Sequence, residues 1–294
     1  MLIESKQEKV IFSFLWKLIE RTVSYGLQFI IQIILARLLS PSDFGVLALV
    51  LVFISIANVF IQSGLGTSLV QKKVVDDLDF SSVFYLSLSI ALVLYIVLFF
   101  LASIIASFYD NFDLVPIIRV LALTLFPGAF NSIQNAIISR TMQFRGLFYS
   151  SVGAGVVSGI VGIVLAYQGY GIWALVFQQL ANQFCVVVIL WYIVKWRPKL
   201  QFSFERVKVH FSFGWKLLVS SLIDTTYQDL RGLIIGKIYT PATLGYYNRG
   251  QQFPQLVISN INGAIQSVML PALAAQQDYT ERVKSMMRRS IVTS

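Results

Sequence analysis

The sequence predicts an all-α integral membrane protein with about eight transmembrane helices, and three observations lead to this fold class. First, 56% of the 294 residues are hydrophobic and only 13% are charged, whereas ordinary soluble domains carry about 25% charged residues. Second, the mean hydropathy is +0.73. Third, apolar runs of the roughly 20 residues that cross about 30 Å of hydrocarbon recur along the chain. They lack the alternation of barrel strands, so we predict helices.

The apolar runs are of two kinds. Four are free of charged residues and cover residues 44–62, 83–108, 147–167 and 172–194. Four others contain polar or charged groups and cover residues 12–39, 114–139, 211–239 and 253–275. The first and seventh runs are the least conventional of the eight, because each contains several ionisable side chains. We predict a transmembrane helix for every run.

Lysine and arginine occupy alternate loops, and this pattern predicts the orientation of the chain. Cations near the ends of transmembrane helices are retained on the cytoplasmic side. Basic residues follow the second, fourth and sixth runs, whereas the loops at 109–113 and 167–171 contain none. We therefore expect a multi-pass protein with a cytoplasmic N-terminus. The cytoplasmic loops account for most of the net charge of +9. We therefore expect no nucleic-acid partner.

Two stretches of the chain resemble each other, which indicates an internal repeat. The segment "FSFLWKL" at 12–18 matches "FSFGWKL" at 211–217 except for Leu15 against Gly214. Farther on, "ARLLSPSDFG" at 36–45 aligns with "GKIYTPATLG" at 236–245. This second match keeps a proline and a glycine in register, Pro41 with Pro241 and Gly45 with Gly245.

Six predicted helices separate the start of one copy from the start of the next, so both copies enter the membrane from the same side. Such a parallel repeat is typical of two-lobed transporters, in which the substrate cavity lies between the lobes. We predict a first six-helix lobe at residues 1–200. Residues 201–294 would begin a second lobe of two helices and the start of a third, which we expect to be incomplete.

Polar residues form one stripe on the first predicted helix and another on the seventh. An ionisable group inside a transmembrane helix costs about 2.5–3.5 kcal/mol at the helix centre, so it should face a cavity or a partner. Residues spaced by three or four positions share one helix face. The stripes consist of Arg21, Tyr25, Gln28 and Gln32, and of Asp224, Gln228 and Arg231. We predict that they line a shared cavity.

Other readings of these polar groups stay open. Asp224 either forms a structural ion pair with Arg231 or binds a coupling proton or cation. Arg119, near the start of the fourth run, either extends toward the lipid headgroups or lines the cavity. The amides of the same run either line a sugar path or bond one helix to another, for about 0.6 kcal/mol on average. These amides are Asn131, Gln134 and Asn135.

Three further motifs carry a resemblance to a known family. They are "LARLLSPSDFGVLALVLVF" at 35–53, "SGLGTSLVQKK" at 63–73 and "LPALAAQQDYTERVKSMMRRS" at 270–290. In this order they resemble the oligosaccharide flippases of bacterial surface-polysaccharide pathways, of the lipopolysaccharide and colanic-acid exporter type. These proteins belong to the multidrug/oligosaccharidyl-lipid/polysaccharide exporter superfamily.

The resemblance implies a function as well as a fold. Such proteins have twelve or fourteen helices in two lobes. They are taken to flip undecaprenyl-diphosphate-linked oligosaccharides from the inner to the outer leaflet of the bacterial inner membrane by alternating access. The lipid-linked substrate, membrane lipids and other polysaccharide-assembly proteins are the implied partners. No cofactor is expected, and a proton or sodium gradient is the candidate driving force. A multidrug or cation antiporter and a lipid II-type flippase of the same superfamily are the alternatives.

An enzyme is not expected. Transferase or polymerase chemistry would need a carboxylate cluster, a metal site or a histidine pair. The chain has one histidine, His210, and one cysteine, Cys185. An acidic segment at 74–80 shows no ligand partner in the sequence, so we predict neither a catalytic nor a metal site.

Overall fold

The computed structural model describes residues 2–62, 64–72, 74–141, 143–251 and 254. The chain divides into two units, Met1–Tyr246 and Tyr247–Ser294. The features below belong to the first unit. Its described residues form helices and loops, with no strand among them, as the predicted all-α class requires.

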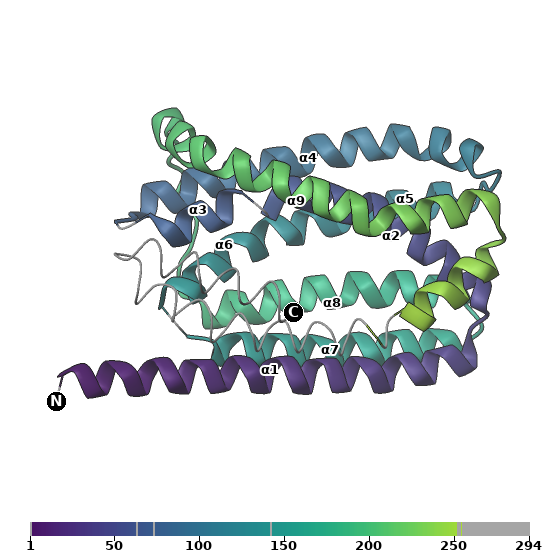
Figure 1. Cartoon of the computed structure of the whole chain (residues 1–294), viewed down its shortest axis with the longest axis horizontal. Helices are drawn as coiled ribbons and strands as arrows, with labels where there is room; N and C mark the ends of the chain where they lie inside the picture. The colour runs from purple at the N-terminus through teal and green to yellow at the C-terminus, as the bar shows by residue number, and fades with distance from the viewer. Residues whose placement is uncertain (1, 63, 73, 142, 252–253, 255–294) are drawn as a thin grey trace, which may run out of the picture. The chain divides into compact units, whose positions relative to one another are not determined.

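The helices of the first unit follow one another through short connections (Figure 1). In chain order they are α1 (Leu2–Leu38), α2 (Pro41–Gln62), α3 (Leu65–Gln71), α4 (Asp77–Phe108), α5 (Leu114–Leu121), the 3₁₀ turn η1 (Ala122–Thr124), α6 (Leu125–Thr141), α7 (Arg145–Tyr167), α8 (Ile172–Ile193) and α9 (Phe204–Ile238).

Local sequence signals explain where two of the long helices begin. At the start of α2, the Ser40 hydroxyl accepts from the Asp43 amide at 3.2 Å, and the Asp43 carboxylate accepts from the Ser40 amide at 3.0 Å. Asp76 and Asp79 form the same reciprocal capping box at the start of α4. Each box satisfies backbone N–H groups that have no partner inside the helix. Pro41 suits the first helical position, where its missing N–H costs nothing.

Six segments of the described chain are long and apolar enough to cross a membrane. They are Leu15–Leu38, Pro41–Gln71, Asp77–Phe108, Leu114–Thr141, Arg145–Tyr167 and Ile172–Ile193. These six confirm the first six predicted helices. The seventh predicted run covers α9 from Phe211 to its end, and this helix is not among the six, so its crossing of the membrane stays a prediction. The eighth run, 253–275, lies outside the described residues except for Pro254.

The predicted fourth helix is interrupted near its middle. The structure divides it into α5, the turn η1 and α6. Pro127 lacks the N–H that would bond to the carbonyl four residues earlier, and that carbonyl belongs to Leu123, inside η1. The proline therefore explains why the backbone tightens at this point.

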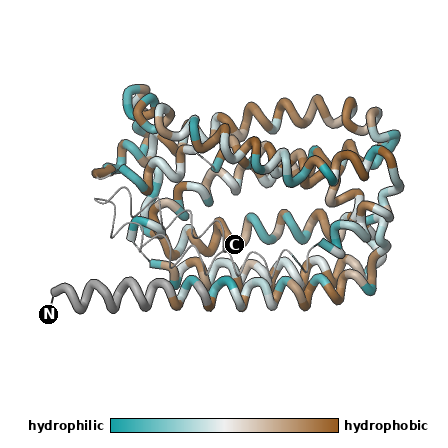
Figure 2. The backbone as a smooth tube through the Cα atoms, viewed as in Figure 1, coloured by the Kyte–Doolittle hydropathy of each residue, from teal (hydrophilic) through white to brown (hydrophobic). Residues whose placement is uncertain are grey.

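The helices form two groups in Figure 1. In the first group, α7 packs against α1 and α8; in the second, α9 packs against α2 and α4. The helix α6 contacts α2, α4 and α8, and so connects the groups. Figure 2 shows hydrophilic stretches on α1, α8 and α9 among largely hydrophobic helices.

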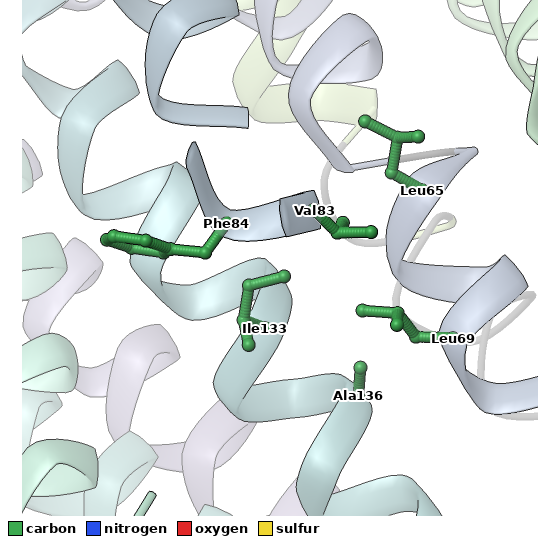
Figure 3. Close-up of a cluster of buried hydrophobic side chains, with 6 residues drawn as sticks. All are labelled: Leu65, Leu69, Val83, Phe84, Ile133 and Ala136. Atoms are coloured by element: carbon green, nitrogen blue, oxygen red, sulfur yellow. The ribbon is translucent and has the colours of Figure 1, made fainter. Parts of the chain in front are cut away.

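A buried apolar cluster holds the short helix α3 against α4 and α6 (Figure 3). Its members are Leu65 and Leu69 of α3, Val83 and Phe84 of α4, and Ile133 and Ala136 of α6. The Phe84 ring also meets the Phe130 ring edge-on, with centroids 4.8 Å apart. This cluster fixes the end of α3 from which the polar groups described below extend.

Glycines bring the two copies of the repeat into backbone contact. A Cβ atom on Gly45 would collide with the carbonyl oxygen of Pro241, and one on Gly245 would collide with the carbonyl oxygen of Pro41. The contact is therefore reciprocal, as a two-fold relation between the copies would produce. The division of the chain into two lobes is not decided by this contact and stays a prediction.

A second backbone contact explains the one difference between the short repeat segments. Gly214 of α9 lies against Gly64, which precedes α3: a Cβ on Gly214 would come within 2.9 Å of the Gly64 carbonyl carbon and oxygen. The first copy has Leu15 at the matching position. Only the second copy faces another backbone here, so only the second copy requires glycine.

We expect the substitution Gly214→Leu, which restores the residue of the first copy, to destabilise the packing of α9. Overpacking typically costs about 1–3 kcal/mol. Gly26→Leu on α1 is the matched control, because a Cβ at Gly26 meets nothing within 4 Å and leucine is the better helix former. Thermal unfolding of the purified variants checks this. Equal melting temperatures for the two variants would contradict the expectation.

Candidate functional site

A polar cavity of about 200 Å³ lies between α1, α7 and α8. Amide and hydroxyl side chains make up most of its lining. The lining residues are Glu20, Ser24, Gln28, Ile31 and Gln32 of α1, Ser151, Gly155 and Ser158 of α7, and Gln178, Gln179, Asn182 and Val186 of α8.

Small residues on α7 allow α1 to approach closely enough to close one side of the cavity. A Cβ on Gly155 would lie 3.0 Å from the Leu27 side chain, and one on Gly159 would lie 2.5 Å from that of Ile31. Small residues at such positions are a common basis of helix packing in membranes. On the other side, Asn182 of α8 donates to the Ser158 hydroxyl of α7 at 3.2 Å.

Two oxygens at this cavity are buried without a hydrogen-bond partner, Ser24 Oγ and Gln32 Oε1. A buried polar atom left unsatisfied costs about 1–3 kcal/mol. Both oxygens can accept hydrogen bonds. The cavity is therefore suited to a ligand or water molecules that donate hydroxyl hydrogens.

The predicted stripe on α1 is divided by the structure. Gln28 and Gln32 line the cavity, whereas Arg21 and Tyr25 lie outside its lining. Glu20 and Ser24 line it instead. Glu20, Ser24, Gln28 and Ile31 are spaced by three or four positions and so share one helix face. This spacing is visible in the sequence, but the prediction followed the arginine instead.

The predicted residues of the fourth run have separate environments. Arg119 donates from Nε to the Phe99 carbonyl at 3.3 Å and lies 4.1 Å from the centre of the Phe99 ring. Asn131 donates to Gln183 of α8 at 3.3 Å, a bond from helix to helix. Gln134 is buried with an unpartnered Oε1, whereas Asn135 is exposed. The structure does not bring these four residues into the polar cavity.

The predicted stripe on α9 lies on an exposed face. Asp224, Gln228 and Arg231 are all exposed, and Gln228 donates to the Asp224 carboxylate at 2.9 Å. A different carboxyl group of α9 faces α2: Asp229 Oδ2 lies 2.5 Å from the Ser55 hydroxyl. The sequence contained no signal for this contact, because Ser55 and Asp229 are 174 residues apart.

The acidic segment at 74–80 contains a carboxylate with several partners, which are basic side chains rather than further metal ligands. The carboxylate of Asp79, fully buried at the start of α4, accepts from Lys72 at 2.8 Å on both oxygens. Arg206 and His210 of α9 approach the same carboxylate to 3.5 and 3.2 Å. The other ring nitrogen of His210 lies 2.8 Å from the Ser68 hydroxyl of α3. We call these five residues the Asp79 cluster.

Neighbouring bonds hold the connection between α8 and α9 over the start of α4. The Ser81 and Ser82 hydroxyls accept from the amides of Lys199 and Ser203 at 3.2 and 3.0 Å. The Lys199 ammonium lies 2.6 Å from the Asp77 carboxylate. Long-range folding was needed to assemble these groups. Among the described residues, no group of three or more His, Cys, Asp or Glu side chains could hold a metal ion.

The Asp79 cluster predicts a pH dependence of stability. Burial lowers the pKa of His210 below its ordinary value of 6.5, and the nearby Asp79 carboxylate opposes this effect only in part. The folded chain therefore prefers neutral imidazole, while the unfolded chain takes up a proton near pH 6.5. Stability should be constant above that pH and should fall as the pH drops below it.

Melting temperatures of the purified chain between pH 5 and 8 test this expectation. His210→Gln should flatten the dependence between pH 5 and 7, because the chain contains no second histidine. A wild-type melting temperature that rises on acidification to pH 5 would show that the buried imidazole is stabilised in its charged form instead.

Two solved structures share the fold of this chain. One is the inward-facing conformation of a multidrug resistance MATE family transporter of the MOP superfamily. It matches with a TM-score of 0.62 at 16% identity, over 90% of this chain and 64% of that one. The other, a MOP superfamily transporter from Pyrococcus furiosus, matches with a TM-score of 0.53 at 16% identity, over 93% and 73%. At this identity the likeness concerns the fold alone.

Curated relatives match by sequence. The lipopolysaccharide biosynthesis protein WzxC of Escherichia coli is 26% identical over 287 residues, 95% of this chain and 57% of the relative. The succinoglycan biosynthesis transport protein ExoT of Rhizobium meliloti is 24% identical over 280 residues, again 95% and 57%. The teichuronic acid biosynthesis protein TuaB of Bacillus subtilis is 24% identical over 220 residues, 74% and 46%. The chain thus spans about half the length of these relatives.

A family model described as "polysaccharide biosynthesis protein" matches residues 34–294. This match includes the glycine contacts between the repeat copies, the Asp79 cluster and the α7 and α8 sides of the polar cavity, whereas the α1 side of the cavity lies before it. It agrees with the multi-pass helical fold and with the relatives. The chain therefore belongs to this family of polysaccharide biosynthesis proteins.

Proposed function

We propose that the chain takes part in flipping undecaprenyl-diphosphate-linked oligosaccharides from the inner to the outer leaflet of the bacterial cytoplasmic membrane. Family membership supports this proposal, because the relatives are named for the biosynthesis or transport of surface polysaccharides. Alternating access between two lobes would provide the movement, with the N-terminus on the cytoplasmic side.

The observation that carries the proposal is the polar cavity between α1, α7 and α8. Its buried oxygens, Ser24 Oγ and Gln32 Oε1, have no hydrogen-bond donor, and sugar hydroxyl groups could donate to them. Ligand pockets for drug-sized molecules are usually about 300–1,000 Å³, so a cavity of about 200 Å³ would accept only part of an oligosaccharide. The lipid tail would stay among the hydrocarbon chains outside.

A multidrug antiporter is supported less well by this lining. Pockets for drug-like ligands are mostly lined by hydrophobic and aromatic side chains, whereas amides and hydroxyls predominate here. A lipid II-type flippase would also handle sugars on a polyprenyl diphosphate. Only the identity of the accumulated substrate would distinguish it.

Deleting the gene tests the proposal. We expect surface polysaccharide to be lost and lipid-linked oligosaccharide to accumulate in the inner leaflet, because the oligosaccharide could be made but not moved. Extraction and analysis of the polyprenyl diphosphate pool measures this. Intact surface polysaccharide without accumulation would contradict the proposal. Accumulated lipid II would favour the lipid II-type alternative, and increased drug sensitivity alone would favour the antiporter.

We expect Gln32→Leu to reduce export about tenfold, because the loss of one hydrogen bond of about 1–1.5 kcal/mol corresponds to a factor of about ten. Polysaccharide on the cell surface is the readout, normalised to the amount of protein in the membrane. Gln228→Leu, on the exposed face of α9, is the matched control. Normal export by Gln32→Leu would remove this cavity from the substrate path.

A further inference from the structure

Asp229 is an acidic residue of α9 whose carboxyl group contacts Ser55 of α2. It lies nine positions before the end of α9 at Ile238, about 14 Å along the helix axis. A hydrocarbon layer is about 30 Å thick, so Asp229 lies near the middle of the predicted seventh transmembrane helix. Its side chain is half-buried, unlike the exposed Asp224.

The two close contacts of the Ser55 hydroxyl indicate whether Asp229 is protonated, because each hydrogen bond needs one hydrogen. Ser55 Oγ lies 2.8 Å from the Val52 carbonyl oxygen and 2.5 Å from Asp229 Oδ2. A serine hydroxyl has one hydrogen, a backbone carbonyl oxygen has none, and an ionised carboxylate has none. With Asp229 ionised, only one of the two contacts contains a hydrogen. With Asp229 protonated, Asp229 donates to Ser55 and Ser55 donates to Val52, so both contacts are hydrogen bonds.

The other helices packed on α9 supply little charge near this position. The one charged residue of α2 is Asp43, twelve positions from Ser55 and about 18 Å along the axis. The helix α3 has no charged residue. The charged residues of α4, Asp77 and Asp79, lie at its far end. Beyond the other end of α4, the Tyr109 hydroxyl donates to the Leu233 carbonyl at 3.4 Å.

The charged groups of α9 itself point elsewhere or have their own partners. Lys237 bonds to Asp110 at 3.1 Å and to the Phe108 carbonyl, and Asp224 bonds to Gln228. Arg231 lies two positions from Asp229, about 200° around the helix. In the part of the chain that the structure describes, the Asp229 carboxylate bonds to the Ser55 hydroxyl. A single neutral donor offsets poorly the cost of a charge in hydrocarbon, and a carboxyl group in such a place takes up a proton instead.

We infer that Asp229 is a proton-binding site, protonated while it bonds to Ser55 and releasing its proton when α9 separates from α2 and the carboxyl group reaches water. The proton passes from Asp229 Oδ2 to water, and the carboxylate that remains is solvated. This inference rests on the proposed transport function for its role, because it makes the proton the coupling ion. The chemistry of the site is independent of the substrate.

Glycine contacts on both sides of Asp229 show why this site would respond to movement of the helices. Gly214 meets Gly64 toward one end of α9, and the Gly45–Pro241 contact lies just beyond the other. Ser55 and Asp229 lie between these contacts. When Asp229 is protonated, its hydrogen bond to Ser55 stabilises the contact between α2 and α9. When Asp229 loses its proton, that bond is replaced by a charge that requires water. Acidification therefore favours the closed contact.

Infrared spectroscopy of the purified full chain tests the site directly. The chain would be placed in vesicles of phosphatidylethanolamine and phosphatidylglycerol at neutral pH. We expect a carbonyl band of a protonated carboxyl group that disappears in Asp229→Asn and remains in Asp224→Asn, the matched control on the same helix. Ser55→Ala should keep the band and shift its frequency, because the carboxyl group loses its acceptor. This second variant leaves Asp229 in place and needs no charge change in the fold.

The outcomes separate the proton site from the transport function. Absence of the band in the wild type, or a band that survives in Asp229→Asn, would overturn the proton site whatever the gene deletion shows. The expected band together with a deletion strain that keeps its surface polysaccharide would leave the site standing and overturn the proposed function. Where both hold, Asp229→Asn should lower export at least tenfold at normal membrane abundance.

Discussion

Hydrocarbon offers no hydrogen bonds, so every polar group that enters a bilayer must find its partner within the protein or in a water-filled cavity. The long helices of this chain answer that constraint for the backbone. Polar side chains form hydrogen bonds with one another or with the backbone. Asn182 bonds to Ser158, Asn131 bonds to Gln183, and Arg119 bonds to the carbonyl of Phe99. Ser24 and Gln32, which have buried oxygens without a partner, both line the cavity, where a polar ligand or water would satisfy them.

The same constraint explains how α2 and α9 are held together along their contact, the α2–α9 seam. Apolar side chains gain little by associating in lipid, so helices there associate by close packing and by hydrogen bonds. Gly214 and Gly64 permit backbone contact at one end of the seam, and Gly45 and Gly245 permit it at the other. Close packing then holds Asp229 against Ser55, where a proton decides whether the carboxyl group is a bonded neutral group or a charge.

Where α3, α4 and α9 meet, the helices are held together by charged side chains. Ion pairs suit this end of the helices, because charges are tolerated near water and headgroups. The Asp79 carboxylate is fully buried, yet Lys72, Arg206 and His210 surround it. A buried carboxylate is tolerated only with such partners. The cluster joins the start of α9 to α3 and α4, so the connection into the second copy of the repeat is tied to the first helices by charge and by the Ser81 and Ser82 hydroxyls.

The sequence by itself determined the class of protein, the first six membrane helices and the repeat, because length, hydropathy and local similarity are properties of neighbouring residues. It also contained Gln28 and Gln32 of the cavity. Only the tertiary structure decided which carboxylate of α9 faces the other helices, that Gly214 rather than a leucine belongs at its position, and that the acidic segment at 74–80 has partners. Helical spacing places a residue on a face but does not say what that face meets. Ser55 and Asp229, like Asp79 and His210, come from distant parts of the chain, and only packing brings them together.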